Sequence, residues 1–131
     1  KGKEDLAGVA PANVVFTGYL PEQEFVDLLW SCDVVLDLTT LEDCLVCGAY
    51  EAVAAEKPMI LSETKANREL FSKGALYVNN TADDIARQIE VAVARLEHLQ
   101  KDCMDLRREI DVAWDRRRRE LEHILAGLGQ A

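Results

Sequence analysis

Acidic side chains and a predicted helix start come together after the second predicted strand. Glu42 and Asp43 are adjacent there, and Glu51 follows eight positions after Asp43. The helix is expected to begin near Cys47, and the unbonded backbone N–H groups at a helix start attract anions. Gly48 has no Cβ, so a ligand can approach the backbone at that point. This stretch is therefore the leading candidate for a site that binds an anionic ligand.

Cys44 and Cys47 in the same stretch have the Cys-x-x-Cys spacing of a thioredoxin-like redox module. Against that alternative, Pro58 follows too soon to be the proline that faces the disulfide in such a fold. A zinc site would need two further ligands, and Cys32 and Cys103 make no second closely spaced pair. We expect reduced thiols and no metal in the chain, and we keep the redox module as an alternative function.

The elements that hold the candidate site are predicted from apolar runs and from the helical spacing of apolar residues. The predicted strands are apolar throughout rather than alternating, which is typical of a parallel sheet covered on both faces. We therefore predict an α/β fold: a partial Rossmann-like parallel sheet of about four strands, with flanking helices and a long C-terminal helical segment. The predicted strands are Asn13–Gly18, Val34–Thr39, Pro58–Ser62 and Ala75–Asn79, and helices are predicted at 21–32, 48–56, 67–73 and 82–128, the last with a break near Gln100–Asp102.

The candidate site occupies a favourable place in this predicted fold. Ligands of parallel sheets gather at the carboxyl ends of the strands. Of the four predicted ends, Thr39–Gly48 is the longest and the most acidic. We assign residues 1–131 to one domain, in which the polar residues 1–12 are a linker or the remnant of a preceding element and residues 82–128 are a helical tail.

Composition narrows the class of protein. The chain has 131 residues, 49% of them hydrophobic and 30% charged, which is the balance of a soluble globular domain. Its net charge of −9 argues against a nucleic-acid partner, because phosphate binding needs a basic surface. No apolar run is long enough to span a membrane. We expect a cytoplasmic protein, in which any membrane association belongs to a part that precedes this chain.

The run T-T-L-E-D-C-L-V-C-G-A-Y-E-A-V-A-A-E-K-P-M-I resembles the donor-site signature of retaining glycosyltransferases with two Rossmann-like domains (family 4, group 1 type). In that signature an acid precedes a Glu by eight positions, as Asp43 precedes Glu51, and Glu56-Lys57-Pro58 stands where the family has Gly-x-Pro. Upstream, N-V-V-F-T-G-Y-L and S-C-D-V-V-L-D-L resemble two strands of the family, and Trp114 falls where its final helices often carry a Trp. The resemblance covers roughly residues 12–125.

The resemblance implies roles for the acids. Glu51 would accept hydrogen bonds from the ribose hydroxyls of a nucleotide, a task that suits a fixed carboxylate. The first acid of the signature would contact the hydroxyls of the donor sugar, and either Asp43 or Glu42 can fill that position.

The resemblance also implies roles for backbone groups and for the base. Amides at the start of the helix would face the diphosphate, and the turn after the first predicted strand would border the base. The first set comprises Leu45, Val46, Cys47 and Gly48, and the second comprises Gly18, Tyr19 and Leu20.

The implied activity is hexosyl transfer from a nucleotide-diphosphate sugar with retention of configuration, in carbohydrate biosynthesis. The donor is a substrate, no cofactor is implied, and the acceptor stays unknown. In the family, two further strands, a basic residue pair and an N-terminal acceptor domain precede this region, so we expect the chain to be truncated at its N-terminal side and inactive alone. We expect a homodimer through an exposed sheet edge or the helices. A non-catalytic nucleotide-binding or interaction module is the other alternative.

Overall fold

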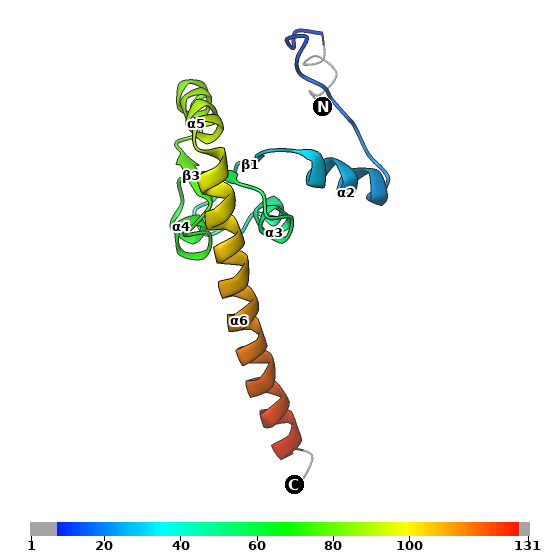
Figure 1. The fold of residues 1–131 in the computed structure, drawn as a ribbon, viewed down its shortest axis with the longest axis vertical. Coiled ribbons are helices and arrows are strands. Elements are labelled where there is room, and N and C mark those ends of the chain that lie inside the picture. The colour runs from blue at the N-terminus through cyan, green and yellow to red at the C-terminus, as the bar shows by residue number, and fades with distance from the viewer. Residues whose placement is uncertain (1–7, 129–131) are drawn as a thin grey trace.

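The computed structural model describes residues 8–128 and contains a three-stranded parallel sheet flanked by helices (Figure 1). The order in the sheet follows the order in the chain: β1 (Val35–Asp37), β2 (Met59–Ser62) and β3 (Ala75–Val78). The predicted α/β class is confirmed, with three strands in place of about four. The helices are α2 (Glu22–Ser31), α3 (Cys47–Ala54), α4 (Lys65–Leu70), α5 (Ala82–Ala94) and α6 (Leu96–Leu128).

The central strand β2 explains why the strands are apolar without alternation. Met59 and Leu61 belong to one core cluster with side chains of α3 and α6, whereas Ile60 belongs to a second cluster with α5. All four residues of β2 are buried because helices cover both faces of the sheet. The larger cluster is completed by Val46, Ala49, Ala52, Val53, Phe71, Cys103 and Leu106.

The prediction of a strand at Asn13–Gly18 was wrong. Val15 is 80% exposed and Phe16 54% exposed, and the segment pairs with no strand among residues 8–128. Apolar and β-branched residues favour a strand, but a strand also needs a neighbour to receive its hydrogen bonds. In Figure 1 this segment and α2 lie to one side of the sheet, and α2 buries no residue.

The predicted break in the C-terminal helices near Gln100–Asp102 was also misplaced. The break falls at Arg95, whose N–H donates to the carbonyls of Val91 and Ala92 as α5 ends. The earlier turn lets Leu99 join the cluster on the α5 face, while Cys103 joins the cluster on the α3 face. The spacing of apolar residues runs across Arg95 without interruption, so it gave no signal of the turn.

Helix α6 runs well past the sheet (Figure 1). Its first part packs in the core, but Trp114 is 66% exposed, and the apolar side chains beyond it are exposed as well. These are Leu121, Ile124, Leu125 and Leu128. Among residues 8–128, no helix is long and apolar enough to cross a membrane.

Candidate functional site

The carboxyl ends of all three strands are joined by a ring of hydrogen bonds. The backbone N–H of Thr39 donates to Ser62 Oγ at 2.8 Å, and Ser62 Oγ donates to Asn80 Oδ1 at 2.7 Å. Asn80 Nδ2 donates in turn to the carbonyl oxygen of Thr39 at 2.8 Å. Ser62 is buried, so this ring fixes the point from which the chain leaves β1 and enters the predicted site.

Glu42 and Asp43 have different surroundings in the loop that follows β1. Glu42 Oε1 accepts a hydrogen bond from the backbone N–H of Lys65 at 2.8 Å, at the start of α4. Thr64 caps the same helix by accepting from the N–H of Asn67 at 3.2 Å. Asp43 is exposed, and its carboxylate has no hydrogen bond or ion pair with any other residue of 8–128. Of the two acids, only Asp43 has a carboxylate that is free of other partners in the described chain.

The start of α3 presents unbonded backbone N–H groups. Val46 is the N-cap residue, is buried, and offers no side-chain cap. The predicted amides of Leu45, Val46, Cys47 and Gly48 donate no hydrogen bond to another residue within 8–128. Such groups, together with the positive end of the helix dipole, are suited to bind an anion.

Packing against Asp37 is a second reason for a glycine at position 48, besides access for a ligand. A Cβ at this position would lie 2.5 Å from Asp37 Oδ2 and 3.2 Å from Asp37 Cγ. The carboxylate of Asp37, at the end of β1, thus packs directly against the first turn of α3, where the helix dipole favours a negative charge. Asp37 lies inside an apolar run in the sequence, so its position beside the candidate site gave no signal beforehand.

Glu51 lies on the solvent face of α3. Ala49, Ala52 and Val53 anchor the opposite face in the core, and the ring of Tyr50 packs edge-on against Phe71 with centroids 5.0 Å apart. The Glu51 side chain is exposed and forms no hydrogen bond or ion pair within the described chain. A rigid helix therefore holds a carboxylate that is free to accept hydrogen bonds from a ligand.

The structure does not bring the predicted base-binding turn to this site. Gly18 has a φ of +64°, as a tight turn requires, and Tyr19 is 97% exposed. The turn, Leu20 included, borders a separate hollow of about 440 Å³ formed with α2. No hydrogen bond joins residues 8–31 to residues 33–128. The loop before α3 and the helix itself thus make one group, and the turn at Gly18 stands apart from it.

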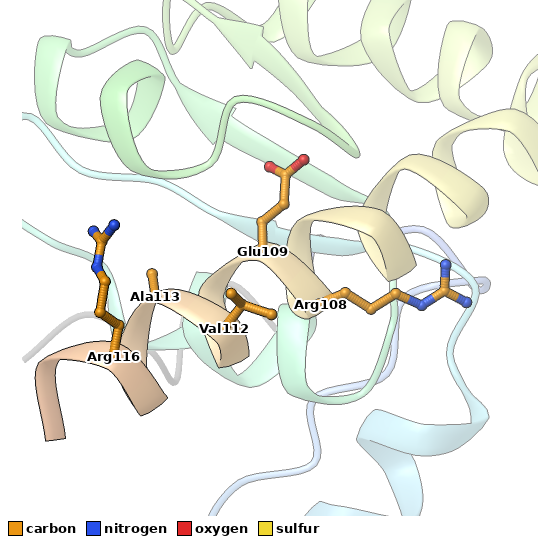
Figure 2. Close-up of a pocket in the computed structure, with 5 residues that line it drawn as sticks. All are labelled: Arg108, Glu109, Val112, Ala113 and Arg116. Atoms are coloured by element: carbon orange, nitrogen blue, oxygen red, sulfur yellow. The ribbon is translucent and has the colours of Figure 1, made fainter. Parts of the chain in front are cut away.

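A hollow along α6 is a weaker candidate (Figure 2). It measures about 340 Å³ and is lined by Arg108, Glu109, Val112, Ala113 and Arg116. Figure 2 shows that all five side chains project from the same helix, so no second element encloses a ligand there. Ligand sites are usually concave and enclosed by several elements. The carboxyl edge of the sheet remains the better site.

The four cysteines are free thiols. Cys103 is buried, and burial, with a smaller effect of Glu56, raises its pKa to about 11. Burial also raises the pKa of Cys32 above its usual value. Cys44 is half-buried and Cys47 is exposed at the first position of α3. Residues 8–128 hold no cluster of three or more His, Cys, Asp or Glu side chains that could bind a metal ion.

We expect the thiols of Cys44 and Cys47 to do no redox work. The double variant Cys44→Ala/Cys47→Ala keeps every backbone N–H of the loop, so its affinity for nucleotides should stay within about twofold of wild type, a change of less than 1 kcal/mol. Insulin reduction by the wild-type chain should not exceed background. Reduction of insulin that disappears in the double variant would establish the thioredoxin-like alternative.

The parallel sheet is Rossmann-like, and exposed acids and unbonded helix-start amides lie at its carboxyl edge, where ligands of such sheets usually bind. The chain belongs to the glycosyl transferase-like family, whose sequence profile matches residues 2–126. A search of curated proteins and a search of solved structures gave no match. Membership of this family implies glycosyl transfer, with a sugar donor and an acceptor as substrates.

Proposed function

We propose that the chain binds a nucleotide-diphosphate sugar and supplies the donor half of a retaining hexosyltransferase with two Rossmann-like domains. One observation carries this proposal: along the chain, the unbonded amides of Leu45–Gly48 are flanked by two exposed carboxylates without partners in the described chain, Asp43 and Glu51. A diphosphate needs the amides, and the hydroxyl groups on either side of it need acceptors. The arrangement at the carboxyl edge offers both in the order that a nucleotide sugar presents them.

Glu51 takes the ribose in this proposal. Two vicinal hydroxyl groups can each donate to one oxygen of a carboxylate, and such charge-assisted bonds are stronger than bonds between neutral groups. The buried face of α3 keeps Glu51 in place before the ligand arrives. Because the backbone at Glu51 is already ordered in the helix, binding costs little conformational entropy there.

Asp43 takes the first-acid role, in contact with the sugar. Glu42 already accepts a hydrogen bond from the N–H of Lys65. If Glu42 turned toward a ligand, that N–H would lose its acceptor. The eight-residue spacing to Glu51 also starts at Asp43. We assign Glu42 to holding the loop.

Charge at the diphosphate is incompletely balanced by the described residues. The basic side chains of α4 are paired, Lys65 with Glu69 at 3.8 Å and Arg68 with Glu63. Stabilising a departing diphosphate needs further positive charge, which we propose comes from a preceding segment of the protein, together with the acceptor-binding domain. Binding of the base would also require the turn of Gly18, Tyr19 and Leu20 to move toward α3.

The test of this function is titration calorimetry on the 131-residue chain with uridine, adenosine and guanosine diphosphates and their glucose derivatives. We expect saturable binding of at least one pair and no sugar transfer, because no positioned acceptor is available. Absence of binding by every ligand would refute the donor function. Turnover at rates usual for enzymes, about 1 per second or more, would refute the expected inactivity.

A further inference from the structure

We propose that Asn80 is a positioning residue for the sugar-contacting part of the donor site and that it acts through the backbone of Thr39. The inference rests on the proposed donor function and deepens it. Asn80 contacts neither of the acids assigned to the ligand, and its effect would pass along the loop that carries Asp43.

Both the backbone and the side chain of Asn80 are held in a specific arrangement. Its φ of +58° lies in the left-handed region, which most residues adopt only at an energetic cost. Asn adopts this region more readily than most residues, because its side chain can bond nearby groups. Here both ends of the amide are used: Oδ1 accepts from Ser62 Oγ at 2.7 Å and Nδ2 donates to the carbonyl of Thr39 at 2.8 Å.

Ser62 and Asn80 together fix both backbone polar groups of one residue, Thr39. Ser62 is 1% exposed and accepts the N–H of Thr39, while Asn80 itself holds the Thr39 carbonyl. Thr39 Oγ1 then accepts from the N–H of Leu41 at 3.1 Å, which starts the turn into the loop. The direction in which the loop leaves β1 therefore depends on the ends of β2 and β3.

The loop has three anchors, and Asp43 lies between the last two. Thr39 is held by the ring, Glu42 by the N–H of Lys65, and Val46 by burial in the core. A hollow of about 430 Å³ opens beside the first anchor and is lined by Leu38, Thr39, Thr40, Leu41 and Asn80. Release of the first anchor should therefore disturb the approach of the sugar to Asp43.

The ribose-binding acid should be affected much less. Glu51 is carried by α3, whose own buried side chains Ala49, Ala52 and Val53 pack in the core, and the helix contacts the sheet and α6. Loss of the Asn80 side chain should consequently weaken binding of a nucleotide sugar more than binding of the matching nucleoside diphosphate. This difference between two ligands separates positioning from a general loss of stability, which would weaken both.

The decisive variant is Asn80→Gly in the 131-residue chain. Glycine adopts a φ of +58° without strain, so only the two side-chain bonds are lost. By calorimetry with uridine diphosphate and its glucose derivative, and the adenosine and guanosine pairs alongside, we expect about fivefold weaker binding of the nucleotide sugar. The nucleoside diphosphate should change by less than about twofold, and the amide of Thr39 should exchange with solvent faster.

Two further variants test the same inference, one at Asn80 and one as a control. Asn80→Asp keeps the acceptor for Ser62 but places a carboxylate oxygen against the Thr39 carbonyl, so it should show the same selective loss. Asn79→Ala is the matched control, because Asn79 bonds Asp84 instead of the loop and alanine keeps its backbone N–H. The ratio of the two dissociation constants should stay at the wild-type value in this control.

The outcomes distinguish failure of this inference from failure of the donor function. If the wild-type chain binds none of the ligands, both the donor function and the positioning role of Asn80 are refuted. If it binds them and Asn80→Gly keeps the wild-type ratio, only the positioning role is refuted. An equal shift of the ratio in Asn79→Ala and Asn80→Gly would also refute it, because the effect would then belong to the end of β3 in general.

Discussion

Gly74→Ala should destabilise the fold by about 3 kcal/mol, combining a left-handed backbone penalty of about 1–2 kcal/mol with overpacking of similar size. Gly74 has a φ of +68°, and a Cβ there would lie 2.7 Å from the Cα of Cys103 and 2.8 Å from its backbone nitrogen. Those atoms belong to α6 and cannot rotate away. Relief requires moving the helix, which would withdraw the buried Cys103 from the core and stretch its bond to the Lys57 carbonyl.

Urea unfolding followed by circular dichroism measures this loss, and two other glycines provide controls. Gly18 has a similar φ of +64° but nothing within 4 Å of a Cβ, so Gly18→Ala should cost only the backbone penalty of about 1–2 kcal/mol. Gly127 lies in α6 with open space around it, so Gly127→Ala should be neutral or stabilise by up to about 1 kcal/mol. A Gly74→Ala variant as stable as Gly18→Ala would contradict the close approach of Gly74 to α6.

The part of the fold that sequence predicts well is the sheet itself. The three runs that become β1, β2 and β3 are mostly apolar because helices cover both faces of the sheet. Such a pattern can be recognised in the sequence without knowledge of the tertiary structure. The helix predicted at 67–73 lies at 65–70 in the structure, and Gly74 directly precedes β3. The close approach of α6 to Gly74 joins residues far apart in the chain, so no local pattern predicts it.

The errors share a physical cause, because each concerns a choice between locally similar states. Asn13–Gly18 has strand-forming residues but no neighbour to pair with in the described chain. The turn at Arg95 interrupts a helical pattern whose apolar spacing would also suit a single helix. Tertiary packing made the choice in both cases, and propensity alone could not.

Of the candidate site, only the features that form a local pattern could be predicted from sequence. A loop after a buried strand, with acids and a helix start, is a local pattern, so Asp43, Glu51 and the amides of Leu45–Gly48 could be predicted from sequence, and their role in binding stays a prediction. The ring of Thr39, Ser62 and Asn80 joins the ends of three strands and follows no periodicity. The choice between Glu42 and Asp43 likewise needed the position of Lys65.

The second large effect is expected at Glu51. Glu51→Gln should weaken binding of the nucleoside diphosphate by about 1–3 kcal/mol, because glutamine offers one neutral acceptor where two charged oxygens stood. That loss corresponds to a rise in dissociation constant of about 5- to 160-fold. The side chain is exposed and unpaired within the described chain, so the fold should not change. Asp43→Asn should instead weaken the nucleotide sugar and spare the diphosphate.

Calorimetric titration of wild type, Glu51→Gln and Glu90→Gln with the tightest-binding nucleoside diphosphate tests the donor site most directly. Glu90 is also an exposed glutamate, on α5, and its replacement makes the same change in charge away from α3. We expect wild-type affinity for Glu90→Gln and a loss of about fivefold or more for Glu51→Gln. Equal affinity of all three proteins would contradict the assignment of the ribose to Glu51 and with it the donor site at α3.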